Sequence, residues 1–255
     1  MDIATILGLV VGIGSVLAAF LMEGGHLSAL IQLPAMILVI FGTFGAATVT
    51  TSVKQLVNLP NLMKIAFLEK QMDSPRLIDL LFDLSQKARK NGLLSLEKDI
   101  DAIHEPFLRK AIRLAIDGFE TNKIREILEI EMAYIEERHK AGANFFMKLG
   151  GFSPTLGIIG TVLGLIHALG NMENSSNMAS AIASAFIATL WGVALANLIY
   201  LPLSDKLKQK HQDEALYLEI ITEGTISIAM GDNPRVIRMK LISFLLPDKR
   251  SEIVK

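Results

Sequence analysis

The sequence predicts an all-α membrane protein with four transmembrane helices, a helical cytoplasmic domain between spans 2 and 3, and a helical cytoplasmic tail. Four apolar stretches approach the roughly 20 residues that a helix needs to cross the hydrocarbon core of a bilayer. They are residues 3–22, 33–52, 150–170 and 179–201. None of them contains Asp, Glu, Lys or Arg. No strand pattern competes with the helical periodicity elsewhere in the chain.

The distribution of basic residues predicts how the spans are oriented. Of the Lys and Arg residues, 16 lie in segment 54–148 and 9 in segment 206–255, so the other two connections between spans contain none. By the positive-inside rule, both termini and the long middle segment face the cytoplasm. Residues 3–22 are interpreted as a retained span and not as a signal peptide, because they follow Asp2 instead of a basic segment.

Residues 53–149 form the predicted cytoplasmic domain. Ser74 is the expected N-cap of its first helix, with Pro75 at the first helical position, and Gly92 follows the end of this helix. A second helix is expected to begin at Ser95.

Apolar periodicity predicts the remaining cytoplasmic helices. A helix over residues 107–116 stops at Gly118, and a long charged helix then leads into the third span. The apolar edge of that long helix consists of Ile124, Leu128, Met132 and Ile135. In the tail, residues 202–255, two helices are expected on either side of a Gly-Asp-Asn-Pro turn: residues 216–228 and 236–245.

Composition excludes several classes of function. The net charge is −1, and segment 54–148 holds 16 basic and 15 acidic residues, which indicates a surface for protein contacts and not for nucleic acid. There is no cysteine, so disulfides and thiol chemistry are excluded. No metal-ligand spacing, phosphate-binding loop or nucleophile triad is present, so we expect neither an enzyme nor a cofactor.

The apolar segments lack an ionisable residue but are rich in small ones. An intramembrane carboxylate or lysine usually marks the working site of a pump or carrier, so this chain lacks its own cation acceptor. Small residues recur at about four-residue spacing, which allows helix backbones to approach closely. They are Gly157, Gly160 and Gly164 in the third span, and Ala181, Ala185, Thr189 and Ala196 in the fourth.

Two hydroxyls and two prolines in these spans each admit two interpretations. Thr161 and Thr189 either bond to carbonyls of their own helices or line a cation path, where an ion leaving water needs replacement oxygens. Pro154 either starts a helix or frees backbone carbonyls beside a pathway, and Pro202 either ends a helix or does the same.

Charged residues at the predicted junction of two cytoplasmic helices are a candidate contact site. Arg89 and Lys90 close the first helix and Glu97 opens the next, which are positions that the helix macrodipole alone would also favour. The sequence leaves open whether these residues stabilise helices or bind a partner.

Several segments together resemble one family. The arrangement of spans is accompanied by ARKNGLLSLEKDI at 88–100, SPTLGIIGTVLGL at 153–165, ATLWGVALANLIYLPLSDKL at 188–207 and NPRVI at 233–237. Together these resemble the flagellar stator A subunits, the MotA/PomA family, over essentially the whole chain. The resemblance implies a homopentamer in the bacterial inner membrane that surrounds two helices of a B subunit and couples ion flow to rotation.

The resemblance also implies partners and residue roles. The B subunit, MotB- or PomB-like, carries the ion-accepting aspartate, and a FliG-like protein of the rotor switch complex contacts the cytoplasmic domain. Pathway positions are implied for Pro154, Gly157, Thr161, Thr189 and Pro202. Rotor contacts are implied for Arg89 and Glu97, with Lys90 beside them.

The coupling ion is expected to be sodium. Sodium must exchange its hydration shell for several protein oxygens, whereas a proton can reach a carboxylate along water. Sodium-driven members of the family carry threonine at the position of Thr161, and many proton-driven members carry alanine. We therefore expect transient Na⁺ near Thr161 and Thr189, with H⁺ as the alternative. The sequence also leaves open two different classes of protein: a three-span ExbB/TolQ-like energising subunit, and a scaffold without ion coupling.

Overall fold

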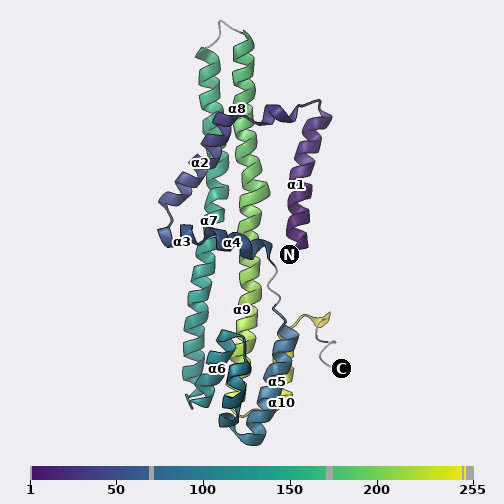
Figure 1. Ribbon diagram of the computed structural model, residues 1–255, viewed down its shortest axis with the longest axis vertical. Helices are drawn as coiled ribbons and strands as arrows, with labels where there is room; N and C mark the ends of the chain where they lie inside the picture. The colour runs from purple at the N-terminus through teal and green to yellow at the C-terminus, as the bar shows by residue number, and fades with distance from the viewer. Residues whose placement is uncertain (1, 69–71, 171–174, 249, 251–255) are drawn as a thin grey trace. The chain divides into compact units, whose positions relative to one another are not determined.

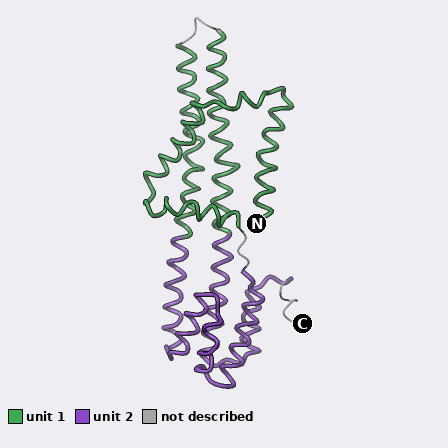
Figure 2. The backbone as a smooth tube through the Cα atoms, in the orientation of Figure 1, with its two compact units in different colours: residues 1–70, 139–209 green, residues 71–138, 210–255 purple. Residues whose placement is uncertain are grey.

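The computed structural model describes residues 2–68, 72–170, 175–248 and 250, and helices are the only regular elements in those residues. The predicted all-α class is therefore confirmed for this part of the chain. The chain comprises two compact units (Figure 2). Unit 1 comprises Met1–Lys70 and His139–Gln209, and unit 2 comprises Gln71–Arg138 and Lys210–Lys255. Two long helices, α7 (Thr121–Gly170) and α9 (Leu201–Ala229), contribute residues to both units.

Unit 1 contains the apolar helices (Figure 1). Besides parts of α7 and α9 it holds α1 (Ile3–Met22), the 3-10 helix η1 (Leu27–Leu30), α2 (Leu33–Val49), α3 (Val53–Val57), α4 (Leu59–Phe67), α8 (Ser175–Leu195) and the π-helix η3 (Ala196–Tyr200). In it α2 packs against α8 and α1 contacts η3. The side chain of Trp191 in α8 donates a hydrogen bond to the carbonyl of Leu30, with 2.8 Å between nitrogen and oxygen.

Three of the described helical runs are long and apolar enough to cross a membrane: Ile3–Met22, Thr121–Gly170 and Ser176–Ala229. The segment predicted as a span at residues 33–52 forms α2, which has only 17 residues and ends at Val49. This helix is about 25 Å long at 1.5 Å per residue. Its end is fixed locally, because the hydroxyl of Thr51 bonds to the carbonyl of Ala47 at 2.8 Å and Ser52 caps the next helix, α3.

Pro154 lies inside α7, so the interpretation that it starts a helix is wrong. The boundary predicted between the cytoplasmic domain and the third span, at residues 149 and 150, lies within α7, which runs without a break for 50 residues. Proline removes one intrahelical donor and its ring crowds the carbonyl four residues earlier, here that of Gly150. Packing of this segment against α8 holds it helical despite that cost.

Pro202 is the second residue of α9, so the interpretation that it ends a helix is also wrong. The turn before it is a π-helix, in which the N–H of Leu201 bonds to the carbonyl of Ala196, five residues back. A wider turn relieves the clash that the proline ring would make with the carbonyl of Leu198. The helical run consequently continues from the apolar segment into the polar one.

Unit 2 contains the cytoplasmic helices predicted from the sequence, with altered ends. They are α5 (Ser74–Asn91), the 3-10 helix η2 (Leu93–Ala102), α6 (Pro106–Ile116), α10 (Pro234–Ile242) and parts of α7 and α9. The N-cap of α5 is Asp73 and not Ser74, because the Asp73 carboxylate accepts the backbone N–H of Arg76 at 3.1 Å. The helix expected from Ser95 is a 3-10 helix that begins at Leu93.

Other predicted features of unit 2 agree with its structure. Gly92 follows α5 with a φ of 82°, a left-handed conformation that glycine adopts without strain. Ile124 and Leu128 at the start of α7 are fully buried in the core of this unit, as their spacing predicted. The two helices expected in the tail have different bounds from those predicted. Residues 216–228 belong to the last part of α9, and the helix expected over residues 236–245 is α10, which ends at Ile242.

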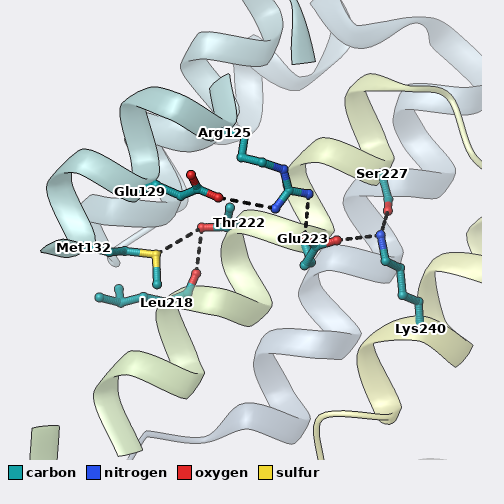
Figure 3. A network of polar contacts seen from close by, with 8 residues as sticks. All are labelled: Arg125, Glu129, Met132, Leu218, Thr222, Glu223, Ser227 and Lys240. Carbon is teal, nitrogen blue, oxygen red and sulfur yellow. Dashed lines mark hydrogen bonds and ion pairs between the residues drawn. The ribbon is translucent and has the colours of Figure 1, made fainter. Parts of the chain in front are cut away.

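A carboxylate that is only 15% exposed joins three helices of unit 2 (Figure 3). Glu223 of α9 accepts hydrogen bonds from Arg125 of α7 and Lys240 of α10, both at 2.5 Å. Burial of Glu223 raises its pKa, but the hydrogen bonds from Lys240 and Arg125 outweigh burial, so the pKa lies below its ordinary value of 4.5. The neighbouring Arg238 of α10 pairs with Asp79 of α5 at 2.9 Å. The helix α10 therefore ties α5 to α9.

Replacement of Glu223 by alanine is expected to lower the free energy of unfolding of unit 2 by roughly 1–2 kcal/mol. The change removes the closest acceptor of two cations, and their partial exposure and remaining contacts with Glu129 and Ser227 keep the loss below that of a fully buried pair. Hydrogen exchange of α5 and α10 amides in the purified full chain would measure it. Because the folded-state pKa is lowered, the stabilisation is present above pH 4.5 and disappears as the pH falls through the folded-state value.

The matched control is Arg76→Ala in the same unit. Its side chain is 89% exposed and, among the residues that the structure describes, pairs only with Asp73, three residues away, so its removal should leave the exchange rates unchanged. An equal increase in amide exchange rates in the Glu223 and Arg76 variants would contradict a special role for Glu223.

Candidate functional site

The helices α7 and α8 approach each other closely at two glycines. A Cβ atom added to Gly192 would lie 2.7 Å from the carbonyl oxygen of Ser153 and 3.0 Å from the Cα of Gly157. A Cβ atom added to Gly157 would lie 3.0 Å from the carbonyl oxygen of Ala188. Backbone atoms cannot move aside as a flexible side chain can, so only glycine fits at these two positions.

The other small residues predicted for packing continue this contact. A Cβ atom on Gly160 would lie 2.7 Å from the Cβ of Ala188, and one on Gly164 would lie 2.6 Å from the Cβ of Ala185. The small-residue spacing thus serves the pairing of α7 with α8 within one chain. Ala181 in α8 is half-buried, and Ala196 in η3 is fully buried.

Thr161 and Thr189 face each other across this contact. The Thr161 hydroxyl lies 3.1 Å from the carbonyl oxygen of Gly157 in its own helix and 3.0 Å from that of Ala185 in α8, and it also bonds to the hydroxyl of Thr189. Thr161 has one hydroxyl proton, so it can donate to only one carbonyl at a time. Two hydroxyl oxygens and two carbonyl oxygens thus lie close together. Oxygen atoms of this kind are the ligands that hard cations prefer.

The sequence analysis missed a buried contact beside this oxygen cluster. The hydroxyl of Ser153 donates to the carbonyl of Gly192 at 2.9 Å, and Ser153 is fully buried. The hydroxyl of Ser153 itself was not assigned a role, because the Ser-Pro pair was interpreted as a possible helix start or through Pro154 alone. Gly192 is three residues after Thr189, and this spacing was the available signal that it belongs to the same face of α8.

The predicted pathway residues do not all meet at one place. Pro154 lies one turn before the oxygen cluster on α7, and it is half-buried. Pro202 instead lines a cavity of about 350 Å³, together with residues of α1, η3 and α9. Its other lining residues are Ala4, Thr5, Gly8, Leu9, Gly12, Asn197, Leu198, Leu203 and Lys206.

The charged residues Arg89, Lys90 and Glu97 lie exposed around the junction of α5 and η2 in unit 2. A salt bridge of 2.8 Å between Lys87 and Asp99 joins the two elements. The sequence analysis overlooked Leu94, a large exposed apolar residue between the cations and Glu97. This junction therefore presents charged groups of both signs around one apolar side chain, which suits contact with another protein.

These features define an α-helical membrane protein that gathers oxygen ligands between apolar helices. The MotA/TolQ/ExbB proton channel family matches residues 99–220, and the N-terminal segment of motility protein A matches residues 6–92. The chain belongs to the motility protein A family. This is a family of channel proteins, which agrees with the expectation that the chain is not an enzyme.

Individual relatives match the chain along almost its full length. Motility protein A of Borreliella burgdorferi is 35% identical over 99% of this chain and 97% of that protein. The structure of C. jejuni MotAB has a TM-score of 0.93 at 33% identity, covering 97% of both chains. The flagellar MotAB stator complex from Bacillus subtilis has a TM-score of 0.92 at 33% identity, covering 98% of both chains.

Replacement of Gly192 by alanine is expected to destabilise the chain by about 1–3 kcal/mol, because the added methyl group would push α7 and α8 apart. Gly151→Ala is the matched control, since a Cβ atom at Gly151 meets nothing within 4 Å. Both substitutions gain the same helix propensity, so their difference reports the contact. Thermal unfolding of the purified protein in detergent measures it, and equal melting temperatures would refute the close approach.

Proposed function

We propose that the chain is the A subunit of a flagellar motor stator, which forms an ion channel with a B subunit and couples cation flow to torque on the rotor. The observation that carries this proposal is the likeness to two MotAB structures along 97% or more of the chain. The match of residues 6–92 to the N-terminal segment of motility protein A favours this function over an ExbB/TolQ-like energising subunit. Membership of a channel family speaks against a scaffold without ion coupling.

The proposed topology has four spans in the bacterial inner membrane, with both termini in the cytoplasm. Two contacts in unit 1 support it. The carboxylate of Asp2, before α1, pairs with Lys206 in α9, whose hydrogen bond lowers the pKa of Asp2 to about 2. The ammonium of Lys148 in α7 donates to the carbonyl of Thr50, after α2, at 3.0 Å. Both contacts join ends that the positive-inside rule assigns to the cytoplasm. A bilayer accommodates a span as short as α2 by local thinning.

The proposed partner within the membrane is a MotB- or PomB-like B subunit, held by a pentamer of this chain around two B helices. The four apolar segments contain no Asp, Glu, Lys or Arg, so the group that accepts the ion must come from another chain. In this arrangement the B subunit supplies the aspartate and the A subunits supply the wall. No cofactor takes part, and the cation is the transported substrate.

The proposed ion is sodium, and the oxygen cluster of Thr161 and Thr189 is its proposed transient contact. The convergence of their hydroxyls with the carbonyls of Gly157 and Ala185 supports a cation that must exchange hydration for protein oxygens. Pro154 and Pro202 are assigned to the same pathway, although the cavity at Pro202 is lined by other residues. A proton-driven stator, in which Thr161 is only a satisfied helix hydroxyl, is the alternative.

The proposed rotor contact is the exposed junction of α5 and η2, with Arg89, Lys90 and Glu97 facing a FliG-like protein of the switch complex. All three side chains are exposed in unit 2, and their removal therefore costs little folding energy. Charges at such a surface mainly set association and its specificity.

Expression of this chain with its B subunit should restore swimming to a strain that lacks its own stator, and neither subunit alone should do so. Arg89→Glu should abolish swimming at normal membrane levels, because the exposed charge contributes to contact and not to folding. Swimming speed in soft agar and immunoblots of membranes measure the two quantities. A compensating charge reversal on the rotor protein should restore swimming.

The control for Arg89 is Arg76→Glu, an exposed arginine at the other end of the same helix, which should swim normally. Loss of the Arg89→Glu protein from the membrane would instead assign Arg89 a structural role at the end of α5.

Swimming speed should rise with sodium at fixed membrane potential and pH, and Thr161→Ala should shift the half-saturating sodium concentration upward about tenfold, equivalent to about 1.4 kcal/mol. Loss of one oxygen ligand is the physical reason. Thr155→Ala is the matched control, because the hydroxyl of Thr155 is exposed and bonds only to the carbonyl of Phe152. A wild-type speed that stays constant down to sodium-free medium would identify a proton-driven stator.

A further inference from the structure

One face of α7 in unit 2 exposes two large apolar side chains at helical spacing. Ile130 is 53% exposed and Tyr134 is 70% exposed, and they are four residues apart. Glu126 and Glu137 are exposed on the same face, because residues four, eight and eleven positions apart share one side of a helix. We call these four residues the α7 stripe.

The helix α10 exposes a second face of the same kind but of opposite charge. Val236 is 49% exposed and Met239 is 65% exposed, and they are three residues apart. Arg235 and Ser243 are exposed beside them. These four residues form the α10 stripe.

Neither stripe is explained by the packing of unit 2 itself. Single exposed apolar residues are ordinary on a soluble surface, but neighbouring ones framed by charge usually mark an interface. Within the described part of the chain, Glu137 makes no ion pair, and neither does Arg235. The two stripes thus offer one unpaired carboxylate and one unpaired guanidinium next to apolar surface.

We propose that the α7 stripe of one copy packs against the α10 stripe of the next copy. Glu137 of the α7 stripe and Arg235 of the α10 stripe carry opposite charges beside apolar surface, so each stripe fits the other better than it fits itself. A contact between two different faces is heterologous, and its repetition closes a ring when the rotation from one copy to the next divides a full turn evenly. The inference rests on the proposed homo-oligomeric stator, for which it supplies an interface outside the membrane.

Disulfide cross-linking tests this interface directly, because the natural chain contains no cysteine. The double variant Tyr134→Cys, Met239→Cys, expressed with the B subunit and oxidised in membranes, should give a ladder of covalent multimers. Co-expression of the two single variants should give dimers and nothing larger, and each single variant alone should stay monomeric. A double variant that stays monomeric, or dimers from one single variant alone, would overturn the proposal.

Two further experiments test whether cross-links depend on the proposed pairing of the stripes and on the charges of Glu137 and Arg235. A second pair, Ile130→Cys with Val236→Cys, should give the same ladder, whereas Leu94→Cys with Met239→Cys should not, because Leu94 lies at the α5 and η2 junction. Glu137→Arg should lose the ladder of the Tyr134 and Met239 pair, and the added reversal Arg235→Glu should restore it. Swimming and co-purification of the B subunit are measured on the same strains. Normal swimming without any ladder would reject this interface and leave the stator function standing.

Discussion

The close approach of α7 and α8 is the contact on which the rest of unit 1 depends. In hydrocarbon, helices gain no hydrophobic driving force from each other, so their association relies on close packing and interhelical hydrogen bonds. Gly157 and Gly192 bring the two backbones together, and this brings the carbonyl of Ala185 within reach of the Thr161 hydroxyl. The helix α2 then packs against α8. A bulkier pair at the glycines would separate the oxygen atoms as well as the helices.

The two units share the helices α7 and α9 but differ in which side chains they bury. In unit 1 many large apolar side chains are exposed and small residues lie between α7 and α8, because lipid or a partner helix can cover apolar surface. In unit 2 a large apolar core is buried, and the carboxylate of Glu223, which is 15% exposed, is neutralised by both Arg125 and Lys240. Because α7 and α9 each contribute residues to both units, the change from one pattern of burial to the other occurs within single helices and not at a loop.

Local signals in the sequence predicted much of this fold. Apolar length predicted the helical runs long enough to cross a membrane, and Gly92 predicted the end of α5, because both signals depend on residues close together in the chain. The continuation of α7 past Pro154 depends on packing against α8, which the local sequence does not contain. Likewise, the hydrogen bond from Ser153 to Gly192 joins residues 39 positions apart, and nothing near Ser153 identifies its partner.

The candidate site was predictable in its residue types but not in its geometry. Thr161 and Thr189 stood out as hydroxyls in apolar segments, yet their direct contact follows from the pairing of two distant helices. Pro202 was grouped with them by resemblance, whereas it lies beside a separate cavity. The residues of the proposed rotor contact were recognisable as charges at a helix end. The intervening Leu94 was not, because one leucine in a leucine-rich segment carries no signal.

The π-helix Ala196–Tyr200 changes the direction in which the side chains after it point around the helix axis. Its wider turn accommodates one residue more than an α-helical turn, and one residue corresponds to about 100° of rotation around the helix axis. Every side chain after it is turned by that angle relative to an unbroken α-helix. Ser204 thereby reaches the carbonyl of Ala143, and Lys206 reaches Asp2. The face that α9 presents to its neighbours is consequently set by a single extra residue, and not by the pattern of the apolar segment that precedes it.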